Sequence, residues 1–230
     1  SRDSSIGHLQ QQVPGCRLIL MGCNAGFAKA VNQGLRHTTT DYAVLINNDA
    51  QIDDGVFAAL HQAFESHPRA AFLGGRLLNQ DGSLQNAIAP FPRLLPELLP
   101  RPVQRMLWPQ RSEGRYSADE DIQVESVIGA LFSIRMAATR DIGLLDEAFF
   151  FFLEETEWCH RALQSGWEVW HIPAARAVHL QGATAKKFNA LARIEYHRSR
   201  LTYFRKTAPA SYPLMLLITW LKAILNALSN

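Results

Sequence analysis

Residues 41–50 read Asp41-Tyr42-Ala43-Val44-Leu45-Ile46-Asn47-Asn48-Asp49-Ala50, an apolar run that ends abruptly in two amides and a carboxylate. The run 42–46 is short, continuous and partly β-branched or aromatic, which predicts a strand covered on both faces of an α/β sheet. Ligands collect at the carboxyl ends of such strands. We therefore expect Asn47, Asn48 and Asp49 at the rim of the sheet, where oxygen ligands meet a hard cation or a sugar hydroxyl. The alternative is an ordinary turn, because Asn and Asp readily bond their own backbone.

Outward from this stretch, strands alternate with helices of roughly a dozen residues, which predicts an α/β sheet with right-handed crossovers. In helix 27–36, Ala28, Val31 and Leu35 are spaced for one buried face. Asp53 or Asp54 is expected to cap the helix that ends near residue 66. The other expected elements are a helix ending near 12, strands 17–21 and 70–74, a turn at 80–83, helix 136–142, and strand 168–172 closed by Pro173.

Composition limits the class of protein. The chain has 230 residues, 47% hydrophobic and 19% charged, which predicts one globular domain with a sizeable core. A formal charge of +2 gives no reason to expect nucleic acid as a partner. The cysteines Cys16, Cys23 and Cys159 are odd in number and irregularly spaced, so neither a disulfide framework nor a Cys-x-x-Cys metal site is indicated. We expect a reducing, cytoplasmic compartment.

Four motifs follow one another along the chain: Asn24-x-Gly26-Phe27-Ala28-x-Ala30-x-Asn32-x-Gly34, then Asn47-x-Asp49, then Phe149-Phe150 with Glu154-Glu155-x-Glu157-x-Cys159, and finally Val178-His179. In this order and spacing they resemble the family 2 glycosyltransferases, and among these the rhamnosyltransferase-like enzymes of bacterial cell-surface polysaccharide synthesis. The resemblance covers roughly residues 1–184. It implies the GT-A fold, a Rossmann-like α/β fold of nucleotide-diphospho-sugar transferases with a mostly parallel mixed sheet.

The opening Ser1-Arg2-Asp3-Ser4-Ser5 resembles the middle of the family's Ser-x-Asp-Gly-Ser turn, which follows its second strand. The resemblance then implies that the first strand, the first helix and the acidic residue that contacts the nucleotide base lie upstream of Ser1. On this interpretation the N-terminus is truncated and the chain is a fragment.

The resemblance also implies substrate-binding residues. Asn24, Gly26 and Asn32 belong to the nucleotide side, where free N–H groups at a helix start favour a diphosphate. The alternative for Gly26 is an ordinary turn glycine with no contact to a ligand. Asn47 and Asn48 are expected to orient ribose or sugar hydroxyls. Gly129 and Ala130 resemble the family's step of small residues, at which a sugar approaches the backbone.

An acidic cluster, Glu154-Glu155-Thr156-Glu157, opens the helix that Gly166 ends. Acids in a first turn are often simple helix-start charges. The four phenylalanines at 149–152 would instead form a dry wall that raises a carboxyl pKa. In the family the corresponding pair is Glu-Asp, and its aspartate is the catalytic base. Glu155 occupies that position here with one extra methylene, so Glu155 is expected to be the base and Glu154 remains a candidate.

The resemblance places a metal at the Asn47-x-Asp49 motif, joined by the histidine of the Val178-His179 motif. Asp49 and His179 are therefore the expected ligands. A carboxylate with an imidazole suits Mn²⁺ or Mg²⁺, with phosphate oxygens completing the shell. The alternative for His179 is a packed or surface histidine.

Two segments depart from the α/β pattern. Residues 89–115 hold six of the eleven prolines and five arginines, which predicts an excursion over the active site, an acceptor surface, or a variable loop. Residues 185–230 form a tail, basic over 186–206 and apolar over 212–225. We expect the part 186–228 to contact an anionic membrane peripherally. The alternatives are a helix that completes the core or the start of a membrane span.

The expected function is inverting transfer of a sugar from a nucleotide-diphosphate donor to a cell-surface glycan or lipid-linked acceptor. The subgroup implies rhamnose on a deoxythymidine carrier as one donor. The alternative is a module that binds nucleotide sugar or glycan without turnover. It is favoured because Glu155 stands where the family has an aspartate, and Asn47 stands where the family's metal motif usually has an acidic residue. A metal-dependent phosphohydrolase would need more carboxylates around the cation.

Overall fold

A computed structural model describes residues 5–13, 15–99, 101–107, 116–117, 119–180 and 189–228. Its centre is a twisted sheet whose strands lie in the order β1 (Tyr42–Ile46), β7 (Leu131–Arg135), β3 (Ala70–Leu78), β8 (Glu168–His179) and β2 (Ala50–Ile52), with β5 (Ile122–Gln123) also paired to β8. In the described part of the chain, β3 and β8 are the parallel pair and the other pairs of this sheet are antiparallel. The sheet is therefore mixed as expected, but less parallel than the sequence predicts.

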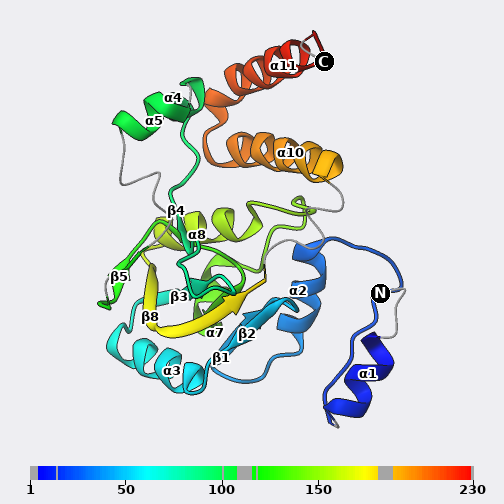
Figure 1. Cartoon of the computed structure of the whole chain (residues 1–230), viewed down its shortest axis with the longest axis vertical. Coiled ribbons are helices and arrows are strands. Elements are labelled where there is room, and N and C mark those ends of the chain that lie inside the picture. The colour runs from blue at the N-terminus through cyan, green and yellow to red at the C-terminus, as the bar shows by residue number, and fades with distance from the viewer. Residues whose placement is uncertain are drawn as a thin grey trace.

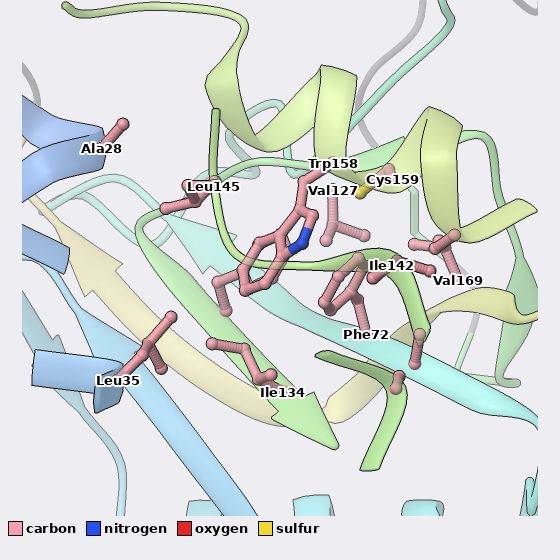
Figure 2. Close-up of a cluster of buried hydrophobic side chains, with 14 residues drawn as sticks. Ala28, Leu35, Phe72, Val127, Ile134, Ile142, Leu145, Trp158, Cys159 and Val169 are labelled. Atoms are coloured by element: carbon pink, nitrogen blue, oxygen red, sulfur yellow. The ribbon is translucent and has the colours of Figure 1, made fainter. Parts of the chain in front are cut away.

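Helices cover both faces of the sheet. On one face lies α3 (Val56–Ser66), which packs against β3 and β8. On the other lie α2 (Phe27–Arg36), α7 (Met136–Ile142) and α8 (Glu154–Gln164). Trp158 of α8 stands in the middle of this second core (Figure 2), where its indole N–H donates to the carbonyl of Gly143. Burial of these apolar side chains fixes α8, and with it the acidic cluster, on the sheet.

The C-terminal part forms a further layer. α10 (Asn189–Thr207), a 3₁₀ turn at Pro209–Ser211 and α11 (Tyr212–Leu228) lie beyond α8, with the short helices α4 (Leu94–Leu98) and α5 (Arg101–Leu107) beside α11 (Figure 1). Phe149, Tyr203, Phe204 and Met215 form a small core between these parts. The tail thus packs on the α/β part of the chain, and the boundary expected at residue 184 lies outside the described residues.

Most expected elements are present. Helices 27–36 and 136–142 have the expected bounds, and Ala28 and Leu35 are buried. α1 (Ser5–Gln12) ends where expected, and Gly82 has a positive φ in the turn that precedes Ser83. The remaining short pair is β4 (Ile88–Ala89) with β6 (Ser126–Val127).

Four local expectations were wrong. Residues 17–21 pair with no strand in the described part of the chain, and Leu20 is 70% exposed. β1 lies at a sheet edge, so it is half-buried rather than covered on both faces. Gly55 precedes α3 at the N-cap, with no side-chain cap from Asp53 or Asp54. β8 continues past Pro173 to His179, because a register shift against β3 between Gly75 and Arg76 accommodates the proline.

Candidate active site

One part of the site is the rim of the sheet where β2 meets the end of β8. Ala50 pairs with His179, and the N–H of Leu180 donates to the carbonyl of Asp49 over 2.9 Å. This pairing brings Asp49 Oδ1 to 3.2 Å from Nε2 of His179. The side chains are 29% and 13% exposed, so the pair is reachable from solvent. The two expected metal ligands therefore lie together, although they are 130 residues apart in the sequence.

The donor set fits a divalent cation in part. A carboxylate oxygen and an imidazole nitrogen suit Mn²⁺, and oxygen ligands suit Mg²⁺. Within the described ranges, no group of three or more His, Cys, Asp or Glu side chains gathers around one point. Asp49 and His179 alone would hold a cation loosely, so a bound ion would draw its other ligands from a substrate or from water.

The second part of the site is the acidic start of α8. Glu154 is 3% exposed, and its burial, followed by the charge of Glu155, raises its pKa to about 9. Burial also raises the pKa of Glu155, against the effect of hydrogen bonds from its own N–H and from the backbone of Gly129. Glu157 differs from both, because Arg161 binds its two carboxylate oxygens at 2.7 and 2.9 Å. Glu157 is thus an ion-pair partner.

A cleft of about 360 Å³ opens beside these acids. Glu155 lines it, together with Phe152 and Leu153, whereas the buried Glu154 is not part of the lining. The lining also includes Tyr196 of α10 and six residues of the Pro- and Arg-rich segment: Pro90, Phe91, Pro92, Arg93, Pro96 and Glu97. Of the two candidate bases, Glu155 is the one that lines a cavity, although its Oε2 is itself buried and has no hydrogen-bond partner among the described residues.

The turn before α8 has unusual backbone geometry. Phe152 and Leu153 have φ angles of 73° and 64°, a left-handed conformation that costs about 1–2 kcal/mol for each non-glycine residue. The hydroxyl of Ser199 in α10 donates a 2.7 Å hydrogen bond to the carbonyl of Phe151. Phe151 itself is 39% exposed, so the expected wall of four phenylalanines is only partly formed.

The expected nucleotide side adjoins the same turn. Gly26 has a φ of 88°, and the next residue, Phe27, donates its N–H to the carbonyl of Phe150 over 2.8 Å. Asn24 is exposed and its side-chain oxygen accepts a 3.3 Å hydrogen bond from the N–H of Gly26. The motif around Gly26 therefore touches the loop that carries the acids.

Two expected substrate residues have other roles. Asn32 is 1% exposed, and its amide bonds both the carbonyl and the N–H of Leu145 as well as Glu147, so it joins α2 to a distant loop. Ala130 is 1% exposed in the core under α3, although its carbonyl accepts the N–H of Asn47. Both residues therefore have structural contacts that a motif does not reveal, and their contact with a substrate stays a prediction.

The remaining expected residues lie near the acids or the rim. A Cβ atom on Gly129 would stand 3.6 Å from Oε1 of Glu155, an ordinary van der Waals distance, so Gly129 lies directly beside the carboxylate. Asn48 is exposed at the rim and Asn47 is half-buried.

Sequence reasoning missed two residues that support this site. Gln85, 3% exposed, bonds His179, and Ser199 bonds the acid turn. The one sequence feature that pointed toward Gln85 was the predicted turn at 80–83, which returns the chain toward the rim.

The sequence and the fold are similar to those of known proteins. The model of the family described as glycosyl transferase family 2 matches residues 1–143. The chain belongs to glycosyl transferase family 2. Over 218 residues it is 25% identical to the N-acetylglucosaminyl-diphospho-decaprenol L-rhamnosyltransferase of Mycobacterium tuberculosis, a match that covers 86% of this chain and 70% of that one. The chain is thus a rhamnosyltransferase-like glycosyltransferase, as the motifs predict.

Solved structures confirm the GT-A fold. GalNAc-T7 in complex with UDP, GalNAc and Mn²⁺ matches with a TM-score of 0.56 at 14% identity, over 78% of this chain and 35% of that one. The mannosyltransferase PcManGT of Pyrobaculum calidifontis, bound to GDP-Man and Mn²⁺, matches with a TM-score of 0.52 at 15% identity, over 92% and 54%. The chain spans only about a third to a half of these proteins.

Proposed function

We propose that this family member transfers a sugar with inversion from a nucleotide-diphosphate donor to a hydroxyl of a cell-surface glycan or lipid-linked acceptor. The observation that carries the proposal is the place of Glu155, a carboxyl with a raised pKa in the wall of a cleft. A raised pKa makes the ionised form a stronger base than an ordinary glutamate. The mycobacterial relative and the motifs favour rhamnose as the sugar.

In this mechanism Glu155 takes the proton of the acceptor hydroxyl while that oxygen forms a bond to the anomeric carbon. The bond from the anomeric carbon to the diphosphate breaks on the opposite side, and its electron pair leaves with the phosphate oxygen. Asp49 and His179 would hold a divalent cation, Mn²⁺ or Mg²⁺, which supplies positive charge for a departing diphosphate. The exposed Asn48 and the half-buried Asn47 would contact hydroxyls of the donor.

The cleft fits an acceptor better than a donor. Its lining is rich in proline and aromatic side chains, and Arg93 and Glu97 supply charges at one wall. Such surfaces bind the faces of sugar rings and apolar chains. We assign residues 89–99 to the acceptor surface, which is one of the roles expected for the Pro- and Arg-rich segment.

The experiment is a transfer assay with deoxythymidine-diphosphate rhamnose and a panel of other nucleotide sugars, with Mn²⁺ or with a chelator. The proposal requires consumption of at least one donor that depends on the cation. Binding of nucleotide sugar without any consumption would favour the alternative, a binding module without turnover.

The tail supplies a further proposal about partners. Leu214, Leu217, Trp220, Leu221 and Ile224 are exposed on α11, while Met215 on its other face is fully buried. Among the described helices, none is long and apolar enough to cross a bilayer. We infer that α11 lies on the cytoplasmic leaflet, where the five exposed basic residues of α10 and α11, against Glu195, favour anionic lipid. Sedimentation with anionic vesicles tests this, and a chain that stays in the supernatant would contradict it.

A further inference from the structure

A chain of hydrogen bonds runs behind the rim from the surface turn at 79–83 to His179. Ser83 donates its hydroxyl to Asp81 over 2.6 Å and accepts the side-chain N–H of Asn79 over 2.8 Å. The side-chain oxygen of Asn79 accepts from Gln85 Nε2 over 2.8 Å. Gln85 Oε1 lies 3.1 Å from Nδ1 of His179. Five side chains thus link a surface carboxylate to an expected metal ligand.

The direction of every bond in this chain is determined. A carboxylate only accepts, and hydrogen bonds with Ser83 lower the pKa of Asp81, so Ser83 must be the donor to it. The Gln85 amide cannot be turned over, because its NH₂ group also donates to the backbone carbonyl of His179, and a reversed amide would set its oxygen against two other oxygens. Gln85 Oε1 therefore accepts, and Nδ1 of His179 carries a proton.

This arrangement decides what His179 presents to Asp49. A neutral imidazole carries one proton, so with Nδ1 protonated the other nitrogen, Nε2, has a free lone pair. Nε2 lies 3.2 Å from Oδ1 of Asp49, a distance at which either a second ring proton or a cation beside both atoms can join them. A divalent cation would take the place of that proton, because Nε2 is the ring nitrogen that points to Asp49. The geometry is the one in which an outer partner sets the tautomer of a metal-binding histidine.

We propose that Gln85 is a positioning residue of the cation site, which holds His179 as the Nδ1–H tautomer and so keeps Nε2 free for a divalent cation shared with Asp49. The inference rests on the proposed cation site. Gln85 suits the role because it is 3% exposed and its backbone N–H is fixed by a 2.8 Å bond to the carbonyl of Leu77. No contact between Gln85 and a substrate is required.

The test pairs two identical substitutions. Gln85→Leu removes the amide from the chain, and Gln51→Leu, at an exposed site of β2 opposite Val178, is the matched control. Mn²⁺ binding, measured by electron paramagnetic resonance with a nucleoside diphosphate present, should weaken about 10- to 100-fold in Gln85→Leu, the range for outer partners of metal ligands. It should stay within about twofold in Gln51→Leu.

A second readout needs no metal. In the metal-free wild type, at a pH where the ring is neutral, the ¹⁵N signals of His179 should show Nδ1 protonated and Nε2 bare, and in Gln85→Leu the proton should move to Nε2, where Asp49 accepts it. A neutral wild-type ring protonated on Nε2, or equal Mn²⁺ binding in Gln85→Leu and wild type, would overturn the inference. A wild type with the Nδ1–H ring that binds no Mn²⁺ would instead overturn the cation site, and with it the role of Gln85.

Discussion

A Cβ atom placed on Gly26 would lie 2.7 Å from the carbonyl oxygen of Phe150. The same oxygen accepts the N–H of Phe27, so the expected nucleotide turn and the loop before the acids are in direct backbone contact. Only glycine allows this approach, since the φ of 88° is also unfavourable for other residues. The expected nucleotide side and the expected base are thereby connected through one backbone contact.

In Gly26→Ala, the added methyl group should push the turn at Gly26 away from the carbonyl of Phe150. We expect a loss of stability of about 1–3 kcal/mol beyond the effect of the positive φ, as for other overpacked sites, with weaker donor binding. Gly22→Ala is the matched control, because Gly22 also has a positive φ of 72° but has no atom within 4 Å of the added methyl. Urea unfolding of both variants measures the difference. Equal losses would show that the contact with Phe150 has no energetic weight.

Ser199→Ala should loosen the turn that carries the acids. The serine hydroxyl bonds the carbonyl of Phe151, next to two residues in left-handed conformations. A shift of the base near 1 Å costs up to roughly a hundredfold in rate. We expect kcat to fall by about 10- to 100-fold with the KM for the donor nearly unchanged. Thr207→Ala, which removes a hydroxyl bonded within the same helix, should retain kcat; similar kcat losses in both would show a general effect on α10.

Asp49→Ala should abolish cation-dependent binding of a nucleoside diphosphate while the fold stays intact, because a rim carboxylate contributes little to the core. His179→Ala should weaken the same binding less. Calorimetric titration with and without Mn²⁺ measures both. Unchanged Mn²⁺-dependent binding in Asp49→Ala would show that Asp49 is not a cation ligand. If His179→Ala weakens nucleotide binding equally with and without metal, His179 has a structural role.

The raised pKa of Glu154 predicts a pH dependence of stability. An unfolded glutamate loses its proton near its ordinary pKa of 4.5, whereas folded Glu154 keeps its proton up to a pKa of about 9. Between these values the folded state binds the extra proton, so stability falls as pH rises from about 5 to 9. In this window the Tm of the wild type should fall by about 2–4 °C more for each pH unit than the Tm of Glu154→Gln. Thermal melts at pH 5.5 and 8.5 that run parallel in both proteins would contradict the burial of an ionisable Glu154.

Much of the fold follows from local patterns. Apolar spacing predicted α2 with its bounds, because helix periodicity is local and repeats along the helix. Strand pairing depends on neighbours far away in the sequence, so the exposure of β1 at a sheet edge and the unpaired residues 17–21 were not predictable.

The candidate site was also predictable only in part. The motif order predicted the meeting of Asp49 and His179, which the structure brings to 3.2 Å. The same motifs assigned Asn32 to a substrate, although its amide is satisfied by Leu145 and Glu147. Gln85 was missed because its role lies in one contact across the sheet rim, and no local pattern encodes such a contact.

The assignment of Glu155 as the base is tested most directly by the turnover of Glu155→Gln beside that of Glu154→Gln. Glu155 lines the cleft, so loss of the base should cut kcat by about 10² to 10⁴ while donor affinity stays nearly unchanged. Glu154 is buried outside that lining, and its variant should keep most of its turnover. If Glu154→Gln is inactive and Glu155→Gln turns over within a few-fold of wild type, the base is Glu154, and the assignment of Glu155 as the base is contradicted.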